Sequence, residues 1–363
     1  MRVKLLAAAC LSILGIILTL GLWPFCAPRN RVAWISNANG LSFSRYGTAF
    51  SLAPFSPLAP DEEARHSVEI WIQPDPPRSC SFLSFFDSQQ SLFLSMRQSV
   101  TDFELQADVV DPKHRLKRAG LYVDEVLSQS KPVFIAITSG SRGTGIYVNG
   151  VLVRQAPQFR IAPLAFKGQL ILGDAPIHPD GWRGDIRGVA IYDSELMGPQ
   201  ILAHYDAWKS SGQPKVTSDE RVAAVYLLNE RRGNVIHNQI KPGMDLVIPE
   251  DYKVLGKLAL EPVWKEFEVS RGYASSLVKN IVGFVPLGFS FYLYLVACRR
   301  TRPALTTIIS GFLVSFTIEV LQIFLPTRDS GTTDLLTNTL GTWMGVLACR
   351  LVGPAWLLQY LPQ

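Results

Sequence analysis

The sequence of 363 residues predicts a multi-domain membrane protein in which an all-β sandwich is inserted into a bundle of four transmembrane helices. Long uncharged runs lie near both ends of the chain, over residues 5–28, 280–298, 303–318 and 335–349. Between them, apolar and polar residues alternate in short runs. Charged residues make up 18% of the chain, against about 25% in a typical soluble domain. This segregation excludes a simple cytosolic enzyme.

Four segments are long and apolar enough to cross a bilayer. A hydrocarbon core about 30 Å thick requires roughly 20 apolar residues in a helix, because no backbone hydrogen bond can stay open in lipid. The expected helices are Leu5–Trp23, Leu277–Ala297, Pro303–Leu325 and Leu335–Ala355. Basic residues precede the first one as in a signal peptide, but no small-residue cleavage site follows it. We therefore expect an uncleaved anchor.

The short loops predict the orientation of these helices. Residues 298–302 hold three arginines, and loops of this kind stay in the cytoplasm. Residues 326–334 hold one arginine and two aspartates, which suits the outer side. We expect a multi-pass protein of the cell membrane, with both termini in the cytoplasm and residues 27–276 outside it.

Alternation of apolar and polar residues in the insert indicates half-buried strands. Val68, Ile70 and Ile72 share one face of such a strand. The pair Asn149-Gly150 supplies the two positive φ values that a type I′ hairpin requires. Further strands are expected at residues 81–86, 92–96, 103–109, 133–138, 169–173 and 182–192, and one amphipathic helix at 194–209. The insert is therefore expected to be all-β apart from that helix.

Three stretches of the insert, Ser67–Pro74, Gly145–Val153 and Gly184–Tyr192, resemble the laminin G or concanavalin A-like lectin jelly roll. The resemblance covers about residues 40–208. It implies a domain of a kind that often binds glycans or proteins, in some members through calcium. Asp185 is the candidate calcium residue, although Arg187 stands where the family usually has a second acidic residue. No other cofactor is predicted.

The division of the chain follows from these features. We expect a first transmembrane helix over residues 1–26, the sandwich over 27–218, a strand-containing extension and tether over 219–276, and three membrane helices over 277–363. The extension at 222–238 looks like the strand that commonly opens such a sandwich, although here it follows the sandwich. It either completes the first sandwich or is the remnant of a second one.

Polar side chains in the apolar C-terminal segments are the main functional signal. A charge at the centre of a membrane helix costs several kcal/mol, so such residues usually have a partner and a function. Residues three or four apart share a helix face, which aligns Glu319 with Gln322 and Asp334 with Asn338. We expect six groups to converge on one outer-leaflet binding site: Asn280, Glu319, Gln322, Arg328, Asp334 and Asn338.

These residues belong to motifs that are similar to those of the VanZ-like membrane proteins. The matching motifs are Asn280–Gly288, Glu319–Gln322, Arg328 and Asp334–Gly341. The match spans about residues 277–352, in a family named for a component of glycopeptide (teicoplanin) resistance. The resemblance implies a link to such resistance but no mechanism, because the family's biochemical activity is largely undefined.

Two interpretations of the polar site stay open. In the first, it binds a membrane lipid headgroup, a lipid-linked cell-wall intermediate or a glycopeptide. In the second, Glu319 or Asp334 pairs with Arg328, and the amides tie helices together. The small-x-x-x-small spacing of Gly341 and Gly345 is expected to serve close helix packing within the bundle.

No hydrolase or nucleotide-binding motif is present in the sequence. The five histidines all lie in the insert and are expected at the surface or hydrogen-bonded in its core: His66, His114, His178, His204 and His237. The formal net charge of +5 is scattered and predicts no nucleic-acid partner. These observations favour a non-enzymatic protein over an enzyme.

The expected function is binding of a glycan or an envelope protein by the outer domain, together with a polar site in the membrane. One alternative is an enzyme or transporter that acts on a lipid-linked envelope molecule at Glu319, Arg328 and Asp334. The other is a structural anchor that displays the sandwich.

Overall fold

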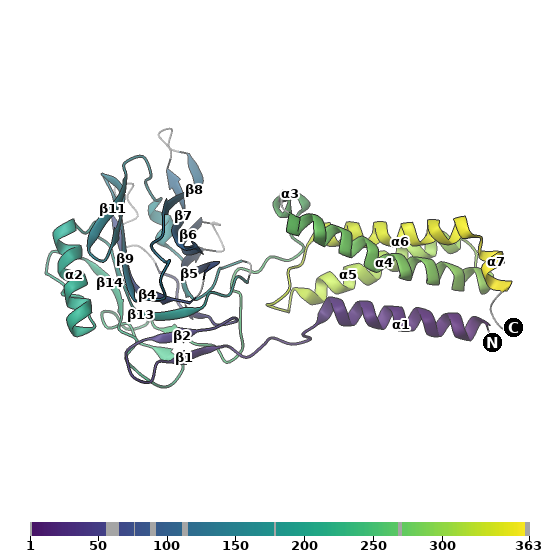
Figure 1. The fold of residues 1–363 in the computed structure, drawn as a ribbon, viewed down its shortest axis with the longest axis horizontal. Coiled ribbons are helices and arrows are strands. Elements are labelled where there is room, and N and C mark those ends of the chain that lie inside the picture. Colours follow the sequence, from purple (N-terminus) through teal and green to yellow (C-terminus); the bar gives the residue numbers. More distant parts are fainter. Residues whose placement is uncertain are drawn as a thin grey trace. The chain divides into compact units, whose positions relative to one another are not determined.

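The computed structural model describes residues 2–55, 65–75, 77–87, 92–110, 115–177, 179–267 and 271–359. Contacts between residues divide the chain into two compact units. One unit is Pro28–Gly256, and the other combines Met1–Ala27 with Lys257–Gln363. The two ends of the chain therefore fold together, and the β-rich segment between them forms a unit of its own. The predicted fold class is confirmed (Figure 1).

Two antiparallel sheets form the β-rich unit, each with eight strands among the described residues. The first sheet has the order β1-β2-β13-β4-β9-β10-β11, with β14 paired to β13. Its strands are β1 (Val32–Trp34), β2 (Leu41–Phe43), β4 (His66–Pro74), β9 (Val133–Gly140), β10 (Gly143–Val148), β11 (Val151–Ala156), β13 (Gly184–Tyr192) and β14 (Val222–Tyr226). The strands at its two ends, β1 and β11, are both short.

The second sheet has the order β15-β16-β3-β12-β5-β6-β7-β8. Its strands are β3 (Ala49–Ser51), β5 (Arg78–Asp87), β6 (Leu92–Val100), β7 (Asp102–Val110), β8 (Leu116–Val123), β12 (Gln169–Leu172), β15 (Val235–Ile236) and β16 (Leu246–Val247). A 3-10 helix, η1 (Pro163–Phe166), precedes β12. The expected strands at 81–86, 92–96, 103–109, 133–138 and 169–173 correspond to β5, β6, β7, β9 and β12.

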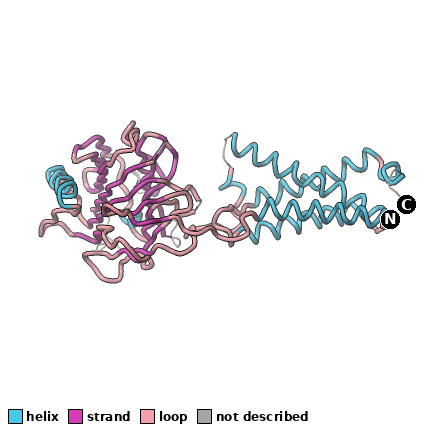
Figure 2. The backbone as a smooth tube through the Cα atoms, turned by 60° about the horizontal axis from the view of Figure 1, so that its bottom comes forward, coloured by secondary structure: helices cyan, strands magenta, loops and turns pink. Residues whose placement is uncertain are grey.

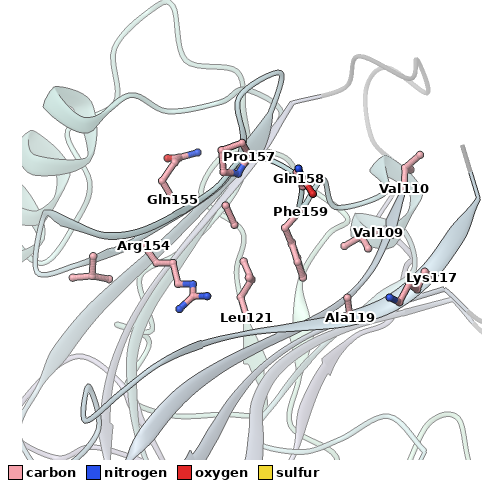
Figure 3. A pocket seen from close by; sticks show the side chains of 12 residues that line it. Val109, Val110, Lys117, Ala119, Leu121, Arg154, Gln155, Pro157, Gln158 and Phe159 are labelled. Carbon is pink, nitrogen blue, oxygen red and sulfur yellow. The ribbon is translucent and has the colours of Figure 1, made fainter. Parts of the chain in front are cut away.

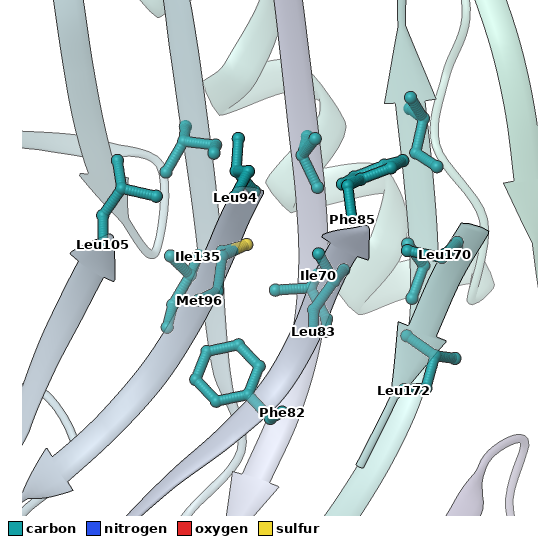
Figure 4. Packing of buried hydrophobic residues seen from close by; sticks show 14 of the residues in the cluster. Ile70, Phe82, Leu83, Phe85, Leu94, Met96, Leu105, Ile135, Leu170 and Leu172 are labelled. Carbon is teal, nitrogen blue, oxygen red and sulfur yellow. The ribbon is translucent and has the colours of Figure 1, made fainter. Parts of the chain in front are cut away.

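The inner faces of the two sheets share one hydrophobic core (Figure 4). Ile70 and Ile135 enter it from the first sheet, and Phe82, Leu94 and Leu105 enter it from the second. All five are at most 1% exposed. Each residue of this kind contributes about 1.5–3 kcal/mol through burial, so the alternating apolar pattern accounts for the sandwich.

The outer face of the first sheet is also covered. Helix α2 (Gly198–Ser211) packs Ile201 and Trp208 against Phe134, Ala190 and Tyr192, which form a second buried cluster. This helix begins with Pro at N1/N2 and ends at Gly212, whose φ of 71° suits the left-handed end of a helix. Because α2 covers this face, both sides of the central strands are buried.

The segment after α2 completes the sandwich, which decides between the two alternatives that the sequence left open. Strand β14 pairs with β13 in the first sheet, while β16 pairs with β3 in the second. The predicted hairpin at Asn149-Gly150 is confirmed, with φ values of 50° and 82° at the turn between β10 and β11.

The second unit is a bundle of long helices that lie side by side (Figures 1 and 2). They are α1 (Arg2–Leu22), α4 (Arg271–Ala297), α5 (Pro303–Gln322) and α6 (Thr332–Val352); α3 (Val263–Glu266) and α7 (Pro354–Gln359) are short. All four long helices have the length and composition of membrane spans. Helix α4 begins six residues before the expected Leu277, and α5 ends three before the expected Leu325.

Glycines allow α4 and α6 to approach backbone to backbone. A Cβ atom on Gly345 would lie 2.2 Å from the carbonyl oxygen of Val285, and one on Gly341 would lie 2.2 Å from that of Ile281. From the other helix, a Cβ on Gly288 would lie 2.1 Å from the carbonyl oxygen of Thr342. The expectation that Gly341 and Gly345 serve packing within the bundle is thus correct.

Candidate functional site

The polar residues of the bundle make hydrogen bonds in two places, at the start of α6 and at the end of α1. Glu319 on α5 is 1% exposed, so its carboxylate faces protein and not lipid. Its Oε2 accepts a hydrogen bond from the backbone N–H of Gly331, at 2.8 Å. Gly331 is the N-cap of α6, where the helix dipole favours a negative charge. The fold therefore holds this carboxylate at a helix N-terminus.

Two of the six predicted residues contact each other directly. The Nδ2 atom of Asn280 on α4 donates to Oδ1 of Asp334 on α6, at 2.6 Å. The other amides have partners that the sequence did not indicate. Nδ2 of Asn338 donates to Oγ of Ser315 at 3.0 Å, and Nε2 of Gln322 donates to the carbonyl of Gly21 at 2.9 Å.

Arg328 is anchored on backbone carbonyls at the end of α1. Its Nε donates to the carbonyl oxygen of Trp23 at 2.8 Å, and its Nη2 donates to that of Leu20 at 3.0 Å. Across the described residues, no ion pair joins Arg328 to Glu319 or to Asp334. Its guanidinium instead donates to carbonyl oxygens at the C-terminal end of α1, where the helix dipole favours a positive charge.

Two residues of the tether reach the same region and were not singled out in the sequence. Glu266 on α3 accepts hydrogen bonds from the backbone N–H and the hydroxyl of Thr333, in the first turn of α6. Lys257 donates to the carbonyl oxygens of Gln322 and Leu325 at the end of α5. Burial lowers the pKa of Lys257 to about 8, although the negative charge of Asp329 opposes that shift. The sequence did not predict a role for either residue, because neither belongs to a periodic apolar and polar pattern.

Among the described residues of the bundle, two buried side-chain amide oxygens have no hydrogen-bond partner. They are Oε1 of Gln322 and Oδ1 of Asn338, on side chains that are 7% and 5% exposed. An acceptor buried without a hydrogen bond costs about 1–3 kcal/mol. Both atoms can accept a hydrogen bond from a bound molecule or from water.

The sandwich carries a groove of about 840 Å³ along one open side (Figure 3). Edge strands β8 and β11, the last strands of their sheets, line it together with the end of β7 and residues 157–159. Val109, Leu121 and Phe159 are buried side chains in its lining. Edge strands present unpaired N–H and C=O groups, which are ready partners for hydroxyl groups. Its volume lies in the range of ordinary ligand sites.

The two charged residues in the described lining of the groove are both basic. Lys117 on β8 and Arg154 on β11 are exposed, and both extend over the groove in Figure 3. Within the described ranges, neither side chain has an ion-pair partner, whereas the neighbouring Arg118 pairs with Asp108 at 3.2 Å. No carboxylate lies among the described lining residues. The groove therefore offers two positive charges that no described residue compensates.

The candidate calcium residue, Asp185, lies on β13 and is partly exposed, opposite Gln73 of β4 and Ser42 of β2. In the part of the chain that the structure describes, no three His, Cys, Asp or Glu side chains form a group that could hold a metal ion. A calcium site at Asp185 stays a prediction.

The described histidines have three different environments. His237 is exposed beside Asp245, whereas His204 is fully buried and lies between two carboxylates. Its Nδ1 is 2.7 Å from Oε1 of Glu69, and its Nε2 is 3.1 Å from Oε2 of Glu220. Burial would lower the pKa of His204, but the hydrogen bonds and charges of the two carboxylates outweigh it and raise the pKa.

His66 is buried as well, but within the described part of the chain its Nε2 atom has no hydrogen-bond partner. The expectation that each histidine is exposed or hydrogen-bonded thus applies to Nδ1 of His66, which lies 3.2 Å from Oδ1 of Asp193, but not to its Nε2. His114 and His178 lie outside the described residues.

Two family models match the chain. The VanZ/LLP1 model matches residues 223–353, which includes β14 to β16 as well as the C-terminal helices. The concanavalin A-like lectin/glucanases superfamily model matches residues 46–202. No protein of curated function matches.

Solved structures that resemble the sandwich are distant relatives at most. The ligand-binding domain of botulinum neurotoxin serotype D in complex with N-acetylneuraminic acid is 18% identical, with a TM-score of 0.36 over 50% of this chain and 45% of that one. The binding domain of botulinum neurotoxin DC in complex with rat synaptotagmin II is 13% identical, with a TM-score of 0.40 over 51% and 46%. The Ruminococcus gnavus IT-sialidase CBM40 bound to α2,3 sialyllactose is 13% identical, with a TM-score of 0.35 over 47% and 95%.

The chain thus spans less than half the length of the neurotoxin domains that it matches. At these identities the similarity concerns the fold alone, and the assignment rests on the two sheets and the two family models. Together, these observations identify a membrane protein of the cell envelope in which a VanZ-like domain is joined to a concanavalin A-like lectin domain.

Proposed function

We propose that this protein binds an acidic saccharide of the cell envelope in the groove between β8 and β11, without chemical conversion. The observation that carries the proposal is the pair of cations Lys117 and Arg154, which have no ion-pair partner among the described residues. They lie in a groove with no carboxylate among its described lining residues. A guanidinium recognises a carboxylate through paired hydrogen bonds, and an ammonium binds it as a point charge.

Other features of the groove suit a sugar. Sugar rings present both hydroxyl groups and apolar C–H faces. The free backbone edges of β8 and β11 can hydrogen-bond the hydroxyls, and the apolar floor of Leu121 and Phe159 can contact the C–H faces. Membership of the superfamily of concanavalin A-like lectins favours a saccharide over an acidic peptide.

Equilibrium binding to paired oligosaccharides tests this proposal. The full chain in lipid nanodiscs is titrated with trigalacturonate and α2,3-sialyllactose, and with the uncharged galactotriose and lactose. We expect Arg154→Gln to weaken binding of an acidic ligand about tenfold, the loss of one charge-assisted hydrogen bond of about 1.4 kcal/mol. Lys117→Gln should act in the same direction.

Lys131→Gln is the matched control, since Lys131 is an exposed cation that does not line the groove. It should leave the affinity unchanged. Higher salt should weaken binding, because the two cations are exposed and therefore screened. Equal affinity for acidic and neutral saccharides, or equal loss in the control variant, would contradict the proposal.

As a second candidate function, we propose that the polar residues of the VanZ-like domain bind a lipid-linked envelope molecule or a glycopeptide. The unpartnered acceptors of Gln322 and Asn338, close in sequence to the buried Glu319 and to Asp334, favour this over a purely structural role. A link to teicoplanin resistance is part of this second proposal.

Glu319→Gln tests the second candidate with little risk to the fold. The amide keeps a carbonyl oxygen for the N–H of Gly331 and removes only the charge. We expect normal expression and melting temperature together with loss of any change in teicoplanin susceptibility that the wild-type protein confers. Arg328→Ala should cause the same loss. If both variants fold normally and keep the wild-type susceptibility, the second proposal is contradicted and an anchoring role remains.

A further inference from the structure

A second, smaller cavity lies at one end of the sandwich, apart from the groove. It has a volume of about 250 Å³ and lies between the sheets, where Phe55 and Phe166 meet Ile191 of β13. Val222 and Ala223 of β14, Ile240 and Met244 complete its apolar lining. An engineered protein cavity of about 150 Å³ binds benzene, so this one has room for an aromatic ring with a short substituent.

His66 on β4 brings a polar atom to this apolar surface. The side chain lines the cavity, is 3% exposed, and packs its ring on Phe166 with the ring centres 4.6 Å apart. Its Nδ1 lies 3.2 Å from Oδ1 of Asp193, while its Nε2 has no hydrogen-bond partner among the residues that the structure describes. Leaving a buried polar atom unpaired is costly, and native proteins rarely do so without a ligand, water or function.

The position of Asp193 determines what Nε2 can do. In a neutral imidazole, a carboxylate next to Nδ1 favours the proton on that nitrogen, which leaves Nε2 with a lone pair. Nε2 is then an acceptor and requires a donor such as a hydroxyl group. The Asp193 carboxylate and the Lys241 ammonium are the charged groups of the described lining, and they carry opposite signs. The cavity therefore has no net charge with which to attract an ion.

We propose that this cavity binds a small neutral molecule with an apolar body and one hydroxyl group, which donates a hydrogen bond to Nε2 of His66. Phenols and short-chain or cyclic alcohols of about ten non-hydrogen atoms belong to this class. The proposal uses no residue of the saccharide groove, so it stands independently of the function proposed above.

A pair of isosteric probes tests whether the cavity binds a molecule with a hydroxyl group. 4-Ethylphenol and 4-ethyltoluene have the same size and differ in a hydroxyl against a methyl group. Both are titrated into the full chain in nanodiscs, with empty nanodiscs measuring partition into lipid. We expect the wild-type protein to bind 4-ethylphenol about fivefold more tightly than 4-ethyltoluene, as one hydrogen bond between neutral groups predicts.

His66→Phe keeps an aromatic ring over Phe166 and removes Nε2. It should abolish the preference for the phenol, and His66→Gln, which retains a polar group of similar reach, should restore part of it. Lys215→Ala is the matched control, since Lys215 is an exposed lysine that does not line the cavity, and it should change neither affinity. In ¹⁵N-histidine spectra, 4-ethylphenol should shift the Nε2 resonance of His66, and 4-ethyltoluene should not.

Equal binding of the two probes, an unchanged preference in His66→Phe, or no binding above empty nanodiscs would each overturn the proposal. Loss of binding in Lys241→Ala would also overturn it, since it would indicate an anionic ligand. If His66→Phe does not fold, the wild-type probe preference and the ¹⁵N shift decide the matter.

Discussion

At the scale of single residues, one cluster of buried polar side chains in the sandwich is held by several partners at once. Glu69 on β4 contacts His204 and also accepts hydrogen bonds from Tyr192 at 3.0 Å and Trp208 at 3.2 Å. Oε2 of Glu220 lies 3.1 Å from Nε2 of His204. This network ties α2 and the segment before β14 to the first sheet. A buried charge is tolerated here because every member has a partner.

Stability of the sandwich should therefore depend on pH through His204. Its folded-state pKa is raised above the ordinary value of 6.5, so the protonated form is favoured by folding. The stabilisation is complete below pH 6.5 and is lost as the pH rises through the folded-state pKa. We expect the urea midpoint of the sandwich to fall between pH 6 and pH 9.

His204→Gln should remove most of this dependence and cost about 3–5 kcal/mol at pH 6, because two buried carboxylates are left without a cation. His237→Gln is the control, since His237 is exposed. An identical pH profile in wild type and His204→Gln would exclude the network as its source.

At the scale of elements, the sequence predicted those strands and helices whose apolar period is long and regular. Strand β5 buries eight consecutive residues, and β4 alternates Val68, Ile70 and Ile72 into the core. Strand β8 was missed because it is an edge strand with one buried residue, Leu121, and therefore no apolar alternation. Strands β1, β2 and β3 were missed because three residues are too few for a period to appear.

The candidate sites were predictable to a smaller extent. Glu319 and Asn338 were predicted as site residues because they are polar residues inside apolar runs, and charged and amide groups are costly in lipid. Their partners were not predictable, since Ser315 and Gly331 are unremarkable in sequence. The groove was not predicted because one of its walls is β8, a strand that the sequence did not indicate.

The glycines between α4 and α6 give an element-scale prediction. Gly345→Ala places a Cβ atom 2.2 Å from the carbonyl of Val285, so the helices must separate. We expect a cost of about 1–3 kcal/mol, seen as a lower melting temperature in detergent. Gly283→Ala on α4 is the control, because nothing lies within 4 Å of its Cβ position. Equal melting temperatures in the two variants would contradict the close approach of α4 and α6.

At the scale of the whole molecule, the N-terminal helix and the C-terminal helices form one unit although the sandwich separates them in sequence. Ile17 of α1 packs with Phe284 and Leu287 of α4 and with Ile318 of α5. Gln322 and Arg328 bond to the last carbonyls of α1. The sandwich is thus an insertion that leaves the bundle intact. Its place outside the cytoplasm stays a prediction from the arginines at residues 299–302.

The central claim is that the open side of the sandwich is a saccharide-binding surface. Hydrogen–deuterium exchange on the full chain, with and without the tightest-binding acidic oligosaccharide, locates that surface directly. We predict slower exchange at residues 116–123 and 151–159, the segments that contribute most of the groove lining, and unchanged exchange in β14 to β16. Protection confined to another part of the sandwich, or no protection at a saturating concentration, would contradict the account.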